Sequence, residues 1–185
     1  MKLRVQILFF AFCFLIDIIL GILFPLDYAL RSMIFVPQMT LAGVILSVRE
    51  MKLTERLLLA LIVGFLLDIT HFDFGFINAI AFASTVLVVA IWSQHMSESF
   101  YELIILTLVG LFIKEIIVFL LYQMAGDTHM SIITWLAKRE FLTMIGNIPI
   151  IIGCIYLNSM KEEILGRQDR IKRSREKVRW MNVNR

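Results

Sequence analysis

The chain has 185 residues, of which 59% are hydrophobic and 18% charged, whereas soluble domains average about 45 to 50% apolar and about 25% charged residues. This composition excludes a soluble globular domain, and it also excludes a disordered or low-complexity chain. The net charge is +3, and residues 161–185 hold nine Lys and Arg against four Asp and Glu. We therefore expect a membrane protein with a basic cytoplasmic tail and no nucleic-acid partner.

Six apolar stretches, separated by polar residues, predict six transmembrane helices. They cover residues 5–24, 33–48, 57–70, 76–92, 103–123 and 141–157. A helix needs about 20 residues to cross a bilayer, so the second and third stretches must borrow flanking residues. The sequence thus predicts an all-α polytopic membrane protein, with a six-span domain over residues 1–160 and a basic tail over residues 161–185.

The distribution of basic residues predicts the orientation of these spans. With the N-terminus inside, the inner loops and the tail hold 14 Lys and Arg. The outer loops hold only Arg31, Lys138 and Arg139. Because cytoplasmic loops carry the excess of basic residues, we expect both termini to be cytoplasmic.

Two connections have features of their own. Residues 70–75 leave room only for a tight hairpin, in which Gly75 can take the positive φ of a sharp reversal. Asp73 or Asn78 is then a candidate cap for the following helix. Residues 132–136 are predicted to form a short helix at the outer interface, with Trp135 at the level of the lipid headgroups.

Four ionisable side chains lie inside the predicted spans, namely Asp17, Asp68, Lys114 and Glu115. Each costs at least about 2.5 kcal/mol in mid-bilayer, so we expect them to face the bundle interior or water. Three of them lie roughly 17 Å from the inner edge of their spans and can meet at one level. Adjacent helical residues project about 100° apart, which predicts that Lys114 pairs with Asp17 or Asp68 and not with Glu115.

These charges have two interpretations. They form either a proton or ion path, or structural ion pairs that fix the order of the helices, and we prefer the structural interpretation. An intramembrane aspartyl protease is disfavoured because residues 64–68 lack the second glycine beside the acid. We expect no metal site, since His71, His95 and His129 fall in three separate loops. No phosphate-binding or nucleophile motif is present, so we expect neither a cofactor nor enzymatic activity.

The last predicted span carries small and helix-breaking residues. Gly146 and Gly153 are seven residues apart on one face, with Pro149 between them, which predicts close helix contact beside a kink. Asn147 is expected to form a hydrogen bond to another helix.

In the tail, Ile164, Ile171 and Val178 recur every seven residues among basic residues. This spacing is compatible with an amphipathic helix on anionic lipid or against a cytoplasmic partner. A solvated basic tail is the other interpretation.

A motif in the predicted hairpin resembles a known family. Gly64-x-x-x-Asp68, a short turn and Gly75-x-x-Asn78 resemble the signature hairpin of the bacterial rod shape-determining protein MreD.

Other segments agree with this family in their order. Pro37 stands where the family has a proline opening span two, residues 115–119 resemble its acid-plus-aliphatic stretch, and residues 139–147 resemble the start of its last span, with Arg139 first. The resemblance runs from about residue 37 to residue 157. The bulky turn at residues 71–74 and the charged Lys114 depart from the pattern.

The resemblance implies a non-enzymatic scaffold of the cell-wall elongation complex in the bacterial plasma membrane. Its implied partners are the single-span protein MreC, a RodA-type glycosyltransferase and the penicillin-binding transpeptidase of that enzyme, within membrane lipid. The implied fold is similar to the substrate-binding subunits of energy-coupling-factor transporters. A vitamin-binding subunit of such a transporter is the alternative, but the A-x-x-x-A pattern of those subunits is missing from span one, which has a lone Ala11.

Overall fold

The computed structural model describes residues 2–24, 33–49, 51–71, 76–93, 99–126 and 130–183, and these contain helices and no strand. The elements are α1 (Lys2–Leu23), α2 (Met39–Val48), α3 (Leu53–His71), α4 (Ile77–Ser93), α5 (Phe100–Ala125), α6 (Ile132–Trp135), the π-helix η1 (Leu136–Glu140) and α7 (Phe141–Val183).

Three helical segments are long and apolar enough to cross a membrane. They are Arg4–Leu23, Phe100–Ala125 and Ile132–Arg167, and two shorter apolar helices, Met39–Val48 and Ile77–Ser93, accompany them. The all-helical class is therefore confirmed, and the long apolar helices are consistent with a helical membrane protein. The count of six spans stays a prediction.

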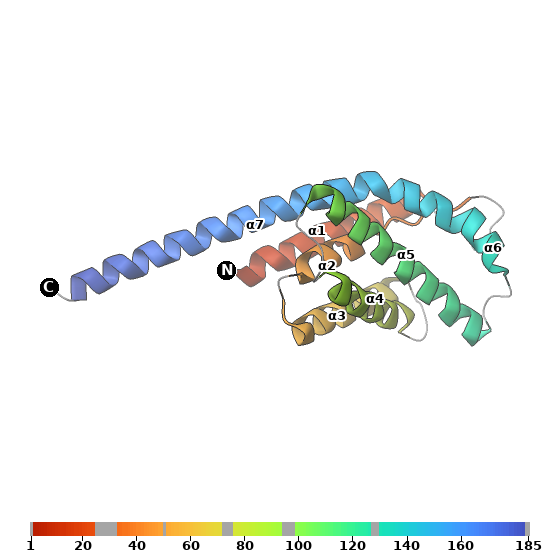
Figure 1. Ribbon diagram of the computed structural model, residues 1–185, viewed down its shortest axis with the longest axis horizontal. Helices are drawn as coiled ribbons and strands as arrows, with labels where there is room; N and C mark the ends of the chain where they lie inside the picture. The colour runs from red at the N-terminus through yellow and green to blue at the C-terminus, as the bar shows by residue number, and fades with distance from the viewer. Residues whose placement is uncertain are drawn as a thin grey trace.

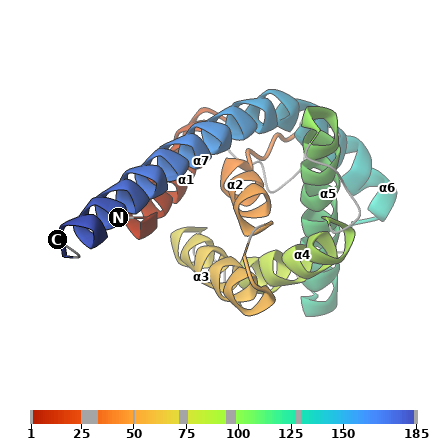
Figure 2. The same ribbon diagram turned by 60° about the vertical axis from the view of Figure 1, so that its left-hand side comes forward.

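Helix α2 is the centre of the bundle. All ten of its residues are buried, and it packs against α1, α3, α4, α5 and α7. Figure 2 shows it enclosed by the longer helices, with the α3–α4 pair on one side and α7 on the other. The core forms where Leu41, Val44 and Ile45 of α2 meet Phe82 of α4 and Leu111 of α5.

The outer faces of the bundle are strongly apolar. Leu8 of α1, Ile91 of α4 and Tyr156 of α7 are each more than two-thirds exposed. Monomeric soluble proteins rarely expose contiguous apolar patches of more than a few hundred Å². Such faces are compatible with contact to lipid, in agreement with the composition.

The second predicted helix is only partly helical. Residues 33–38, which we call the extended segment, have no regular secondary structure, and α2 begins at Met39. Pro37 disfavours the helical conformation of the residue before it, which explains the late start. Non-helical backbone at membrane depth is tolerated where protein buries it, and here the amide of Ile34 donates to the carbonyl of Lys138 at 2.8 Å.

The last helix is continuous from Ile132 to Val183 and projects beyond the bundle, as Figure 1 shows. Pro149 lies inside α7 and does not end it. Trp135 is buried and contacts Phe119, with ring centroids 5.0 Å apart. The predicted short helix is thus present as α6, and the place of Trp135 at headgroup level stays a prediction. The side chains of Ile171 and Val178 lie outside the described residues.

Candidate functional site

The α3–α4 hairpin is held by the residues of its predicted motif. The Asp68 carboxylate accepts hydrogen bonds from the amides of Asn78 at 2.9 Å and Ala79 at 3.0 Å, and from the Asn78 side chain at 3.0 Å. Gly64 lies one turn earlier, where an added Cβ would stand 2.6 Å from the Cα of Ala79. The hairpin thus needs a glycine for close approach and an acid for the cap.

The cap of α4 therefore comes across the hairpin from α3. We expected it from Asp73 or Asn78; the structure gives this role to Asp68, while Asp73 and Gly75 lie outside the described residues. A carboxylate here satisfies free amides at the positive end of the helix dipole.

Replacing Asp68 by alanine should destabilise the protein. Loss of an N-cap typically costs about 0.5 to 2 kcal/mol, and we expect the upper part of this range because Asp68 is 4% exposed. Thermal unfolding in detergent measures the effect. Asp68→Asn retains an acceptor oxygen and should cost less; equal losses for both variants would contradict the capping role.

Asp17 performs the same task for α2. Its two carboxylate oxygens accept hydrogen bonds from the amides of Met39 and Thr40, each at 2.7 Å. The N-terminus of α2 lies inside the bundle, so its free amides have no bulk water to satisfy them. Asp17 supplies the missing acceptors and fixes α1 against α2.

Glu115 is the centre of a buried ionic network. It is fully buried, and its carboxylate pairs with the Lys114 ammonium at 2.8 Å and the Arg139 guanidinium at 3.1 Å. The Gln38 side-chain amide also donates to it at 2.6 Å. Helices α5 and η1 and the extended segment therefore meet at one carboxylate.

The predicted pairing of Lys114 is wrong. Neighbouring helical residues diverge by about 100°, yet the long side chain of Lys114 folds back to Glu115. In the described part of the chain, Asp17 and Asp68 form no ion pair with Lys114, since their oxygens are bound to helix amides. Each of the three acids thus has a separate structural task.

Asn147 of α7 ties down the extended segment. Its side-chain oxygen accepts from the amide of Gln38 at 3.0 Å, and its side-chain nitrogen donates to the carbonyls of Val36 and Thr143, each at 2.8 Å. The predicted contact with another helix is thus made at the N-cap of α2, Gln38, and at the non-helical backbone before it. This arrangement satisfies polar groups that lipid would leave unpaired.

The two glycines of the last span differ in role. A Cβ on Gly146 would meet the ring of Phe35 at 2.5 Å, so this position makes room for the extended segment. Gly153 has no such neighbour within 4 Å in the described structure. The predicted contact surface is therefore confined to Gly146, and it receives a phenyl ring and not a helix.

Sequence reasoning missed several buried polar residues, among them Gln38, Lys161 and Glu140. Gln38 joins the network at Glu115, and Lys161, assigned to the tail, is 5% exposed and donates to Ser47 of α2 at 2.9 Å. Glu140 is 1% exposed, and neither of its carboxylate oxygens has a hydrogen-bond partner among the described residues. The only signal for Glu140 was an acid beside Arg139 at the start of an apolar stretch.

Among the described residues, no group of three or more His, Cys, Asp or Glu side chains is placed to hold a metal ion. Comparisons with protein-family models, with curated proteins and with solved structures find no match for this chain. The site is characterised by its own geometry: two acids cap helices, and a third holds two cations within the bundle.

Proposed function

We propose that this chain is a non-enzymatic membrane subunit of the bacterial cell-wall elongation complex. It regulates cell shape by binding an MreC-like single-span protein, and with it a RodA-type glycosyltransferase and the penicillin-binding transpeptidase of that enzyme. It crosses the plasma membrane six times and has both termini in the cytoplasm. Its contribution is a rigid surface of helices, and it turns over no substrate.

One observation carries this proposal: the residues that resemble the MreD family contact one another in the structure. Gly64, Asp68 and Asn78 interlock in one hairpin. Glu115 and Arg139, which come from two other segments of the resemblance, form a buried ion pair. Residues chosen only for their order in the sequence thus meet in space, which supports the resemblance.

The alternative is a vitamin-binding subunit of an energy-coupling-factor transporter. Broken helices in transporters often aim an N-terminus at an anionic substrate group. In this chain the comparable N-terminus, that of α2, is already occupied by the Asp17 carboxylate. This contact favours the scaffold over the transporter subunit.

Affinity purification from the native membrane tests the proposal. The tagged chain should enrich the MreC-like protein relative to a tagged, unrelated polytopic protein expressed at the same level. Depletion of the chain should alter cell width or shape. Absence of the MreC-like protein, together with thermal stabilisation of the purified chain by a vitamin, would replace the scaffold with the transporter subunit.

A further inference from the structure

An apolar groove lies between α5 and the continuous helix formed by α6, η1 and α7. Its volume is about 730 Å³, and its walls include Phe112, Leu136, Met144 and Ile145. A smaller hollow of about 290 Å³ shares three of these residues and extends the groove to Ile148. From residue 133 to residue 148 the groove follows roughly 22 Å of helix, or about four turns.

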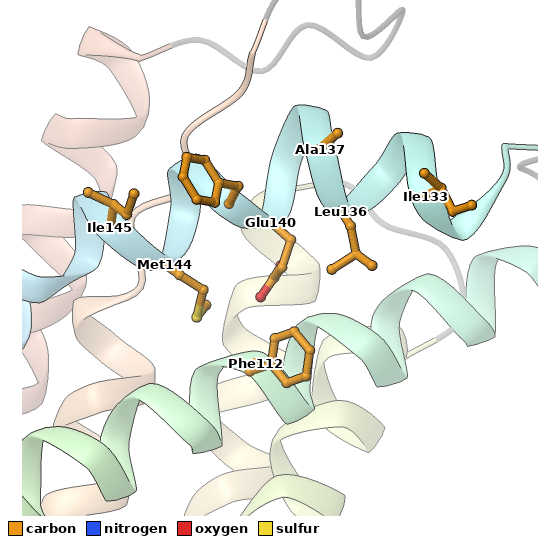
Figure 3. A pocket seen from close by; sticks show the side chains of 8 residues that line it. Phe112, Ile133, Leu136, Ala137, Glu140, Met144 and Ile145 are labelled. Atoms are coloured by element: carbon orange, nitrogen blue, oxygen red, sulfur yellow. The ribbon is translucent and has the colours of Figure 1, made fainter.

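Glu140 is the one acid lining this groove. Figure 3 shows its side chain directed from η1 toward α5, between Leu136 and Met144. Both carboxylate oxygens are buried, and within the described structure neither has a hydrogen-bond partner. Buried polar groups are almost always hydrogen-bonded, so an orphaned carboxyl in an apolar groove requires an explanation.

The neighbouring charges do not satisfy Glu140. Lys114 and Arg139 act on it electrostatically, but the contacts that these two cations make in the described structure go to Glu115 and not to Glu140. If Glu140 is ionised, the two acids Glu115 and Glu140 together balance the charges of the two cations. Its oxygens nevertheless have no hydrogen-bond donor among the described residues. A protonated Glu140 carries a free O–H donor. In either state the wall of the groove contains a hydrogen-bonding group that has no partner among the described residues.

The depth of Glu140 restricts the chemistry of the occupant. Glu115 lies ten residues before Ala125, the outer end of α5 in the proposed topology, which places it roughly 15 Å below that end. Arg139, which the sequence placed in an outer loop, lies within the apolar segment Ile132–Arg167 and pairs with Glu115, and Glu140 is the next residue. Glu140 also lies eight residues inside the apolar segment Ile132–Arg167, or roughly 12 Å from its outer end. This is the outer half of a hydrocarbon core about 30 Å thick, where acyl chains carry no hydrogen-bond donor.

We propose that this groove binds a transmembrane helix of a partner protein, and that the helix presents a hydrogen-bond donor or a cation to Glu140. The apolar walls fit the apolar face of such a helix, and the orphaned carboxyl fits its single polar side chain. The π-helical turn at Leu136–Glu140 is the kind of local irregularity found at functional sites. The inference rests on the proposed function and locates its contact.

Photocrosslinking in the full chain, co-expressed with the MreC-like single-span partner, tests the location. A photoreactive residue at Ile133 in the groove should crosslink to the transmembrane segment of that partner. Ile91 is the matched control, since both side chains are at least 70% exposed and Ile91 lies on α4, away from the groove. Crosslinks from position 133 only to lipid or to a second copy, or equal crosslinks from position 91, would overturn the proposal.

Two groove variants test the chemistry in the same co-purification. Glu140→Leu should lower the amount of partner retained by about tenfold, as expected for loss of one interhelical hydrogen bond. Ala137→Trp should block the groove, whereas Ile91→Trp should have no effect. Normal retention by both groove variants overturns this inference alone. No retention by the unaltered chain defeats the proposed function and the inference with it.

Discussion

Replacing Gly64 by alanine should destabilise this protein far more than the same change at Gly153. A Cβ at position 64 would lie 2.6 Å from the Cα of Ala79, which is backbone and cannot turn aside. Overpacking typically costs about 1 to 3 kcal/mol, and here the α3–α4 hairpin must open to accept the methyl group. The apparent melting temperature of the purified protein in detergent measures the loss.

Gly153 is the matched control for that substitution. It also lies in a helix, but an added Cβ meets no described atom within 4 Å. Alanine forms helices better than glycine, by up to about 1 kcal/mol, so Gly153→Ala should be neutral or stabilising. Equal destabilisation at the two positions would show that helix α3 does not approach α4 as closely as described.

Removal of the Glu115 carboxylate should have the second large effect. Glu115→Leu leaves both Lys114 and Arg139 without their acid, and breaking a buried pair costs about 3 to 5 kcal/mol. Lys114→Met should cost less, because Glu115 keeps its pair with Arg139 and its hydrogen bond from Gln38. Thermal unfolding of the two single variants in detergent gives this order directly.

A double substitution distinguishes the observed pairing of Lys114 with Glu115 from the pairing with Asp17 that the sequence predicted. Adding Asp17→Asn to Lys114→Met should not restore stability, since the oxygens of Asp17 are bound to the amides of Met39 and Thr40. Recovery in the double variant would mean that Lys114 and Asp17 form the true pair. In that case the network around Glu115 must be abandoned.

The sequence was sufficient for the class of fold because the main signal was hydrophobic. Apolar stretches near the length of a bilayer predicted α1 and α5 within a few residues and the start of α7, but α7 continues from the predicted end at residue 157 to Val183. The sequence did not predict the conformation of residues 33–38. An apolar segment of this kind is predicted to be helical, and only backbone hydrogen bonds to other parts of the chain make it non-helical. The partners in those bonds, Asn147 and Thr143, are more than 100 residues away in the chain.

The polar residues show the same limit. The free-energy cost of placing a charged side chain in the membrane identified four residues that need partners, namely Asp17, Asp68, Lys114 and Glu115. Depth along the spans suggested side-chain ion pairs, but two of the acids bind helix amides instead. Hydropathy does not show where a helix begins inside the membrane. The sequence therefore could not predict that an acid from another helix caps it. Glu140 escaped notice because it lies at the edge of its apolar stretch.

The expected stability losses at Glu115 and the depth of the groove both depend on the proposed membrane topology. Single cysteines at Asp127 and Asn184, in a variant lacking Cys13 and Cys154, test it on intact cells with an impermeant thiol reagent. The proposed topology predicts labelling at position 127 and none at position 184 until the cells are opened. Labelling of position 184 on intact cells would contradict the account.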